Sequence, residues 1–291
     1  MFIHPTQRFM PPEGMKERCF RSTYSRSTAP YAIDLHHHDF YEIYYFIGGE
    51  VEYRVEGKTY QLQPGDLLLI NPWEFHQGVV TPGIPYERRV LWIDRTYLAQ
   101  FNDGDTDLTA CFSPAVENRL RPTKAQQTII ESLLEQLRIE QSSSDFGNQF
   151  YAHGIFLQLM VEINRMARHS AHQRDPIKSG ELTSQVIAYI SAHYQEPLTL
   201  QSLADTFFVS KYYLSHEFSR KAGTSVYRYV LLRRLLAARE MIAAGYSPSE
   251  ASAQCGFRDY ANFYRMFKTE YGVTPREFVE GIPEAKKKSI T

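Results

Sequence analysis

The sequence predicts an α+β protein of more than one domain. An N-terminal antiparallel β-barrel with packing helices precedes an all-α C-terminal domain built on a double helix-turn-helix. Three observations predict this organisation. Residues 31–112 carry short strand-like runs separated by turn signals, residues 113–168 carry helical periodicity, and residues 181–282 repeat one helix-turn-helix pattern. A length of 291 residues suits about two domains.

The chain shows no sign of a membrane anchor or a secretion signal. Hydrophobic residues make up 43% of it, but no apolar run is long enough to cross a bilayer, and the N-terminus lacks the basic-then-apolar order of a signal peptide. Cys19, Cys111 and Cys255 are widely spaced and odd in number, which argues against a disulfide framework. We therefore expect a cytoplasmic protein in a reducing compartment.

The net charge of −1 hides an asymmetry between the two ends of the chain. Residues 181–291 contain 14 Lys and Arg against 11 Asp and Glu, a net charge of +3, whereas the preceding residues contain 18 against 22, a net charge of −4. A modestly basic domain behind an acidic one is typical of a nucleic-acid-binding module attached to a second function. The excess is small, so it supports this interpretation without deciding it.

Residues 1–30 are rich in Pro, Arg and Ser and have no clear period, which predicts an N-terminal arm that is poorly ordered unless something holds it. Residues 31–112 change to a strand pattern. Turn signals such as Gly48-Gly49 and Pro64-Gly65-Asp66 separate short runs rich in β-branched and aromatic residues. Short antiparallel strands with such turns indicate a small barrel or sandwich. The predicted strands are 41–47, 51–55, 59–62, 67–70 and 86–93.

Two amphipathic helices follow the strands, at 124–141 and 147–168, within the helical segment 113–168. They could pack against the barrel of the same chain or present a surface to a second subunit. Residues 169–180 are polar and uncapped, which predicts an interdomain linker. The lysine-rich residues 283–291 are expected to form a tail.

The C-terminal domain is predicted from a repeat with an offset of 49 residues. The repeat keeps small, apolar, capping and glycine positions, which suggests a duplicated helix-turn-helix unit. Ser225 to Ala243 contains neither Gly nor Pro and predicts one long helix that joins the two copies. The matched positions are Ala204 with Ala253, Phe208 with Phe257, Ser210 with Asp259, Leu214 with Phe263, Phe218 with Phe267, Gly223 with Gly272, Ser225 with Thr274, Tyr229 with Phe278 and Val230 with Val279.

Capping residues mark the ends of the predicted helices in both copies. Thr199 begins the first copy, and Gly223 ends its second helix. Ser247-Pro248-Ser249-Glu250 begins the second copy with a cap, a first-turn proline and a reciprocal glutamate. Gly272 ends the next helix, and Thr274-Pro275-Arg276-Glu277 begins a closing helix in the same way. These signals predict two complete units.

The exposed side of each second helix carries hydrogen-bond donors and aromatic rings. Such residues suit the DNA major groove, where Arg and Asn read base edges and apolar groups meet thymine methyls. A small helical bundle with a solvated polar face is the alternative, and the doubled, capped pattern favours DNA. The predicted DNA-binding residues are Ser210, Lys211, Tyr212, Ser215 and His216 in the first unit, and Tyr260, Ala261, Asn262, Arg265 and Lys268 in the second.

Residues 181–282 resemble the DNA-binding domain of AraC-type transcription factors. The resemblance rests on stretches such as 200–204, 210–218, 223–225, 233–239, 256–268 and 272–275. It implies two recognition helices on one rigid arm, which enter successive major grooves on one side of the duplex. The family often has Arg where His216 stands in the first helix, and Arg265 keeps that position in the second.

Residues of the strand region resemble the cupin-type sensor domain of the same regulators. In metal-binding cupins, one motif contributes two His one residue apart and a Glu four further on, and a second motif contributes a His eleven residues after its glycine. His36, His38 and Glu42 fill the first motif, and His76 lies eleven residues after Gly65. Residues 36, 38 and 42 are expected on one face of one strand because side chains alternate.

This histidine set has three interpretations: a pocket for an organic ligand, a site for a divalent metal such as Zn, Mn or Fe, or structural hydrogen bonding. We expect the organic ligand, because the segment Pro72 to His76 lacks the glycine of the metal-cupin motif. Aromatic plates beside a few fixed polar groups suit a small carbohydrate, which the family resemblance also favours. No cofactor is predicted. The predicted ligand-binding residues are His36, His38, Glu42, Tyr44, His76, Arg88 and Trp92.

The sequence therefore predicts a ligand-responsive, sequence-specific DNA-binding regulator. Its expected partners are double-stranded DNA, a small effector, a second copy of the chain and RNA polymerase. One competing class is a metal-dependent cupin enzyme fused to a helical domain, with His36, His38, Glu42 and His76 as ligands. The other is a non-catalytic adaptor that uses its helices for protein contacts. Other enzyme classes lack support, because the sequence has no Ser-His-Asp elbow, phosphate-cradling loop or CxxC pair.

Overall fold

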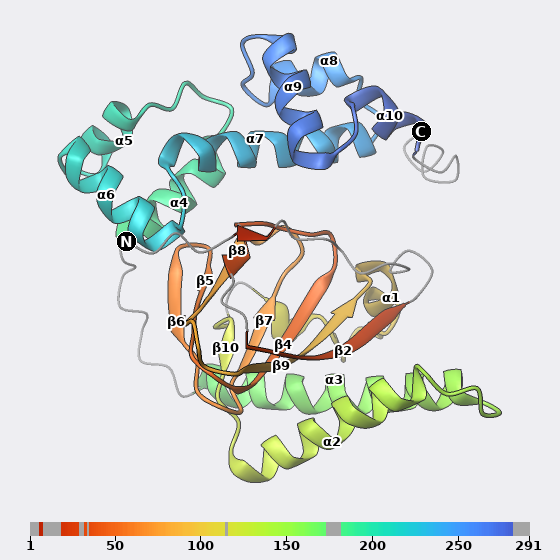
Figure 1. Ribbon diagram of the computed structural model, residues 1–291. Coiled ribbons are helices and arrows are strands. Elements are labelled where there is room, and N and C mark those ends of the chain that lie inside the picture. Colours follow the sequence, from red (N-terminus) through yellow and green to blue (C-terminus); the bar gives the residue numbers. More distant parts are fainter. Residues whose placement is uncertain are drawn as a thin grey trace. The chain divides into compact units, whose positions relative to one another are not determined.

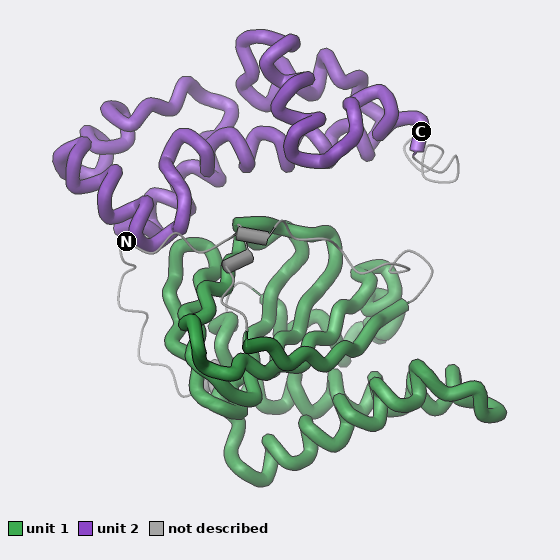
Figure 2. The backbone as a smooth tube through the Cα atoms, in the orientation of Figure 1, with its two compact units in different colours: residues 1–179 green, residues 180–291 purple. Residues whose placement is uncertain are grey.

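Figure 1 shows a computed structural model of the chain, which describes residues 6–7, 19–28, 32–33, 35–113, 116–172 and 182–281. The chain divides into two compact units, residues 1–179 and 180–291 (Figure 2). The first unit holds the strands and helices α1 to α3, and the second holds helices α4 to α10. Within the described ranges, no helix combines the length and the apolar character that crossing a bilayer requires.

The strands of the first unit form two five-stranded sheets, with the orders β1-β3-β8-β5-β6 and β10-β7-β4-β9-β2. Paired strands are antiparallel except for β1 and β3. This confirms the predicted antiparallel, cupin-like fold, although the described strands make two sheets and not one closed barrel. The strands are β1 Thr6–Gln7, β2 Phe20–Ser27, β3 Ala32–Ile33, β4 Tyr41–Gly48, β5 Val51–Val55, β6 Lys58–Gln61, β7 Leu67–Ile70, β8 His76–Val80, β9 Tyr86–Ile93 and β10 Arg119–Leu120.

The sheet that contains β4, β7 and β9 is covered on both faces. Along β4, Tyr44 and Phe46 point into a cluster shared with the other sheet, whereas Ile43 and Tyr45 point into a cluster shared with α2 and α3. Burial on both faces explains why β7 reads Leu-Leu-Leu-Ile with no polar residue. The alternation fixes which residues of β4 and β9 can reach the space between the sheets.

Helices α2 (Lys124–Glu140) and α3 (Asn148–His172) lie along the outer face of this sheet (Figure 1). Polar contacts supplement their apolar packing. The Tyr45 hydroxyl donates to Glu131 over 2.6 Å, and Arg89 lies 2.6 Å from Glu135. A short helix, α1 (Arg95–Ala99), and a single 3-10 turn, η1 (Ala110–Phe112), connect the sheet to these helices.

Two predicted boundaries in the first unit are wrong. Part of the expected arm, Phe20–Ser27, is strand β2, which pairs with β9 along its whole length. Its outward face is polar, so the sequence alternation is weak, but Phe20 is buried and stacks on Phe156 with ring centroids 4.5 Å apart. The expected linker also begins too early, because α3 continues to His172. The rest of the linker, the rest of the arm except 6–7, 19 and 28, and the tail 283–291 lie outside the described residues.

The second unit consists of helices that agree with the predicted caps. Ser225 caps the long helix, which runs to Ala243 as predicted. Gly223 and Gly272 each end the second helix of a helix-turn-helix in the left-handed conformation that glycine tolerates best. The helices are α4 Leu182–His193, α5 Leu200–Thr206, α6 Lys211–Ala222, α7 Val226–Ala243, α8 Pro248–Gln254, α9 Tyr260–Tyr271 and α10 Pro275–Glu280.

The two helix-turn-helix units do not keep a single offset. The caps of their second helices, Ser210 and Asp259, are 49 residues apart, as predicted. The caps of their first helices, Thr199 and Ser247, are only 48 apart. The predicted match of Ala204 with Ala253 is therefore wrong: Ala204 is buried, whereas Ala253 is exposed.

The second helix-turn-helix has one extra residue in its turn, which explains this change of offset. A single residue separates the left-handed Phe208 from the cap of α6, whereas Phe257 and Arg258 separate the left-handed Gly256 from the cap of α9. Phe208 therefore corresponds to Gly256 and not to Phe257. The sequence repeat concealed the inserted residue because a phenylalanine lies near the turn in both copies.

Replacing Gly256 with alanine should lower the stability of the C-terminal compact unit, residues 180–291, more than replacing Gly245 with alanine. Both residues have a positive φ, so both variants carry the left-handed cost of about 1–2 kcal/mol. Only at Gly256 would the new Cβ also meet a backbone atom, the Gln195 carbonyl oxygen at 2.6 Å. Thermal unfolding should show the larger loss in Gly256→Ala, and equal losses would contradict the assigned turn geometry.

Candidate functional site

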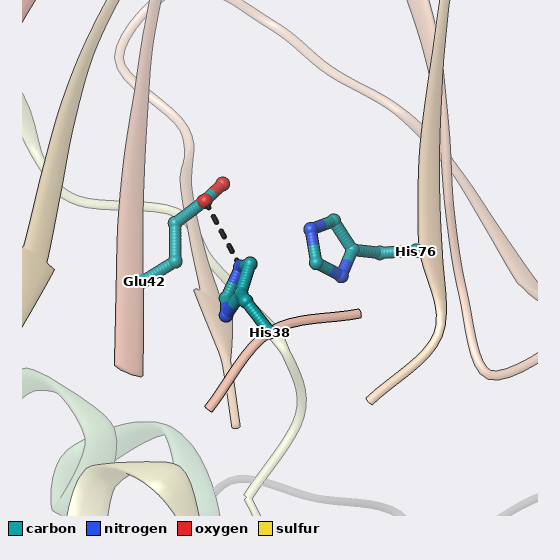
Figure 3. Close-up of side chains that lie close together, drawn as sticks. All are labelled: His38, Glu42 and His76. Atoms are coloured by element: carbon teal, nitrogen blue, oxygen red, sulfur yellow. Dashed lines mark hydrogen bonds and ion pairs between the residues drawn. The ribbon is translucent and has the colours of Figure 1, made fainter. Parts of the chain in front are cut away.

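A buried polar cluster lies at one end of the space between the two sheets. It brings together His38, Glu42 and His76 (Figure 3), whose possible ligand atoms all lie within 4.8 Å of one another. His38 Nε2 is 3.2 Å from a Glu42 oxygen. His36, the fourth residue predicted here, lies beside this group of three, with its ring centroid 4.1 Å from that of His76.

Local backbone structure positions the histidines, although not as the sequence predicted. The expected single strand over residues 36–42 is wrong: β4 begins at Tyr41, after a bend at Asp39 and Phe40. His36 forms an isolated antiparallel bridge with His76 at the start of β8. The bend lets Phe40 stack on His38, with ring centroids 3.9 Å apart. The side chains therefore converge through the bend and not through strand alternation.

Backbone carbonyls locate a proton on Nδ1 in two of the histidines. His76 Nδ1 lies 2.9 Å from the Glu74 carbonyl oxygen, and His38 Nδ1 lies 2.9 Å from the Phe40 carbonyl oxygen. A carbonyl only accepts, so Nδ1 carries a proton in both rings. Nε2 of His76 is then left with a lone pair. It is buried and has no hydrogen-bond partner within the described residues.

Charge in this cluster is balanced around Glu42. Burial by itself would raise the pKa of Glu42, but the hydrogen bond from His38, the positive charge of the neighbouring histidines and the hydrogen bond from Trp92 lower it below its ordinary value. Trp92 Nε1 donates to the Glu42 carboxylate over 2.7 Å. Burial, reinforced by His36 and His38, lowers the pKa of His76 well below its ordinary value. At neutral pH the cluster therefore presents a carboxylate beside a neutral imidazole.

Tyr44 and Arg88 form a second group further along the same strands. The hydroxyls of Tyr44 and Tyr86 share a short hydrogen bond, and the Arg88 guanidinium lies 4.8 Å from the centre of the Tyr86 ring. The pairing of Glu42 with Trp92 and of Phe46 with Arg88 places even-numbered residues of β4 and β9 on one face.

Tyr53 lies between the two groups, and the prediction missed it. Its ring centroid is 4.9 Å from that of Tyr44 and 6.3 Å from that of His76, to which it is nearly parallel. Gly78 is its cross-strand partner on β8, and a Cβ at Gly78 would lie 3.2 Å from the Tyr53 ring. The alternation Val51-x-Tyr53-x-Val55 was the available signal, because all three residues are buried.

The donor set fits either of two ligands. Two imidazole nitrogens and a carboxylate with hydrogen-bonded outer partners resemble the surroundings of many divalent metal ions. The same atoms, next to the rings of Phe40 and Trp92, could instead form hydrogen bonds with the hydroxyls of a small polar molecule. The lone pair of His76 Nε2 would accept a hydrogen bond from a hydroxyl in one case and coordinate the ion in the other.

In the second unit, the predicted DNA-binding residues of α6 lie on its outward side. Lys211 and His216 are exposed, Tyr212 is 82% exposed, and Ser215 is half-buried. The rings of Tyr212 and His216 are parallel, with centroids 6.2 Å apart. The Ser210 hydroxyl accepts a hydrogen bond from the Tyr213 backbone N–H, so this residue caps the helix.

The predicted residues of α9 are also accessible. Tyr260, Ala261, Arg265 and Lys268 are exposed, and Asn262 is half-buried. In the part of the chain that the structure describes, the side chains of Arg265 and Lys268 form no salt bridge. Their charges are therefore available to a ligand. Phe263 and Phe267 bury the opposite side of the helix.

Comparison with known proteins identifies both units. The AraC-like ligand binding domain family matches residues 22–160, and a helix-turn-helix domain family matches residues 203–281. The HTH-type transcriptional activator RhaS of Salmonella schwarzengrund (strain CVM19633) is 24% identical over 254 residues, which cover 84% of this chain and 87% of RhaS. RhaS of Salmonella typhimurium matches to the same extent. These relatives are regulators, so the enzyme alternative loses its support.

Among solved structures, ToxT of Vibrio cholerae matches 90% of this chain and 98% of its own length at 11% identity, with a TM-score of 0.37. The C-terminal domain of AraT from Geobacillus stearothermophilus, a response regulator, matches 35% of this chain and 87% of its own length at 25% identity, with a TM-score of 0.34. Such scores are too low to compare the elements one by one. From the two family matches, the chain belongs to the AraC-type transcriptional regulators with an N-terminal ligand-binding domain.

Proposed function

We propose that this chain is a cytoplasmic transcriptional activator that binds a specific DNA duplex through α6 and α9 and senses a small carbohydrate through its N-terminal domain. One observation carries the DNA-binding part: two capped, outward-facing helices pack against a single connecting helix, α7. The RhaS relatives are named as transcriptional activators, which supports the direction of regulation.

The two helices offer different chemistry to a major groove. Helix α9 offers Asn262 and Arg265, side chains that form paired hydrogen bonds with adenine and guanine. Helix α6 offers Tyr212 and His216, whose parallel rings suit apolar and shape-dependent contact. Its Arg220 is held by Glu217 at 2.7 Å. We therefore assign most of the hydrogen-bonded base reading to α9.

A carbohydrate suits the cluster around His76 because it offers hydroxyls to polar atoms and C–H faces to aromatic rings. The Glu42 carboxylate and His76 Nε2 supply acceptors, and Phe40, Tyr53 and Trp92 supply rings. A divalent metal ion is the second candidate, favoured by the inward-facing Nε2 atoms of His38 and His76. Such an ion would be held by these two rings and Glu42, and would supply a fixed positive charge.

A second copy of the chain is the proposed partner of helices α2 and α3. Large apolar side chains are exposed where the two helices meet: Phe146 fully, Phe150 at 85% and Tyr151 at 60%. Pairing would cover them. Ligand binding would then act by population shift, favouring one arrangement of the dimer and so the simultaneous engagement of its DNA-binding domains. RNA polymerase is the expected recipient of an activating signal.

Replacing Arg265 with alanine should weaken binding to the specific duplex about 5- to 150-fold, the loss of about 1–3 kcal/mol from one base contact. Binding to a scrambled duplex of equal length should change little. The specific duplex is first selected from a randomised library with the full chain, and affinities are compared at one salt concentration. Arg276→Ala is the matched control, because Arg276 is exposed on α10 and paired with Glu280. An equal loss on both duplexes would refute base reading by Arg265.

A sugar that binds the folded sensor should raise the unfolding temperature of the full chain, with about 2.7 kcal/mol gained at 100 times its Kd. A panel of neutral sugars is the test. The shift should disappear in His76→Gln and persist in His37→Gln, because the His37 ring instead contacts Phe75, with centroids 4.9 Å apart. If zinc, manganese or iron(II) gives the His76-dependent shift and no sugar does, the carbohydrate proposal fails and the metal candidate replaces it.

A further inference from the structure

The extra residue of the second helix-turn-helix, Arg258, has no counterpart in the first unit. It is exposed and lies directly before Asp259, the cap of α9. Within the described residues its side chain has no hydrogen bond or salt bridge. An arginine that lengthens a tight turn by one residue and contributes nothing to its internal bonding is a candidate for binding something outside the chain.

Arg258 opens onto a groove of about 520 Å³ inside the second unit. The groove lies between the segment that precedes α5 and the turn that precedes α9, with α7 as its floor. Its polar lining includes Gln195, Tyr227, Arg234, Arg258, Asp259 and Asn262. Asn262 is also one of the residues assigned to base reading, so the groove adjoins the proposed DNA surface.

A second guanidinium, that of Arg234, lies in the same groove. Arg234 donates to the backbone carbonyls of Tyr194 and Glu196, each over 2.7 Å. These acceptors are neutral and leave its charge uncompensated. Burial and then the positive charge of Arg258 lower the pKa of Arg234.

One acidic residue, Asp259, lines the groove, and its oxygens are used at the start of α9. The Asp259 carboxylate accepts the backbone N–H groups of Ala261 and Asn262 at the start of α9. The Glu196 carboxylate lies 2.8 Å from His193 Nδ1. With two arginines, Arg234 and Arg258, against one aspartate, the groove keeps an excess of positive charge beside neutral donors, a combination that favours an anion.

We infer that Arg258, beside the fixed Arg234, binds a backbone phosphate of the duplex whose bases α9 reads. A guanidinium matches the oxygens of a phosphate in shape and charge. A phosphate contact this close to Asn262 would set the depth and register of α9 in the major groove without reading sequence. This inference rests on the proposed DNA-binding function. It gives the two helix-turn-helix motifs different contacts to the DNA backbone, because only the second has the inserted arginine.

The test compares Arg258→Ala, Arg258→Lys and the control Arg276→Ala in the full chain, on the selected and the scrambled duplex. Arg258→Ala should weaken both complexes by a similar factor, about tenfold at 0.1 M salt, and lower the slope of log Kobs against log salt by about one. Arg258→Lys keeps the charge and should retain the slope. Unfolding temperatures confirm that each variant is folded.

Neutral methylphosphonates, placed one at a time along the selected duplex, locate the contact. One position should weaken the wild-type complex and have no further effect on Arg258→Ala. If no position behaves in this way, or if Arg258→Ala loses affinity only for the selected duplex, the phosphate contact is refuted.

Inorganic phosphate is tested separately, by its effect on the unfolding temperature at millimolar concentration. If it raises that temperature in the wild type but not in Arg258→Ala, and Arg258→Ala leaves duplex affinity unchanged, the site binds free anion and the inference is refuted. If Arg265→Ala loses affinity for the selected duplex as expected and Arg258→Ala has no effect, this inference is refuted and the proposed function stands.

Discussion

The burial of helix α7 against both helix-turn-helix units is the constraint on which the DNA-binding account depends. Leu231, Leu235 and Ile242 belong to the apolar cluster of the second helix-turn-helix. Toward the other end, Tyr229 meets Phe218 of the first unit edge to face, with ring centroids 5.6 Å apart. A fully buried side chain of this size contributes about 1.5–3 kcal/mol. Turning one unit relative to the other would expose several of them, so α7 holds the two reading helices as one body.

Polar contacts strengthen the same constraint where α7 meets its neighbours. Arg234 holds the carbonyls that follow α4, and Arg228 lies 2.6 Å from Glu270 at the far end of α9. Gly256 allows the second turn to approach the Gln195 carbonyl closely. The sensor unit follows a different plan, in which a polar cluster is buried between two apolar sheets and has an acceptor, His76 Nε2, left for a ligand. One unit is therefore built for rigidity and the other for recognition of a small molecule.

The sequence predicted the elements whose signals are local. Caps such as Ser247 and Thr274, and the Leu-rich β7, are visible in a few consecutive residues and were placed correctly. It did not predict features that depend on distant partners. Strand β2 has a polar outer face and is fixed by pairing with β9, about 70 residues away. The bend at Asp39 and Phe40, which lets the Phe40 ring stack on His38 and brings His38 to Glu42, interrupts the strand period. The one-residue insertion at Arg258 was hidden by a phenylalanine near each turn.

Missing-base interference on the selected duplex tests the central claim most directly, because it maps which bases each bound copy needs. The account predicts two clusters of essential bases about 10 base pairs apart on one face of the duplex, the spacing of successive major grooves. Replacing Tyr212 should abolish only one cluster, and replacing Arg265 only the other. A single cluster for each bound copy, or the loss of both clusters in either variant, would contradict two reading helices held by α7.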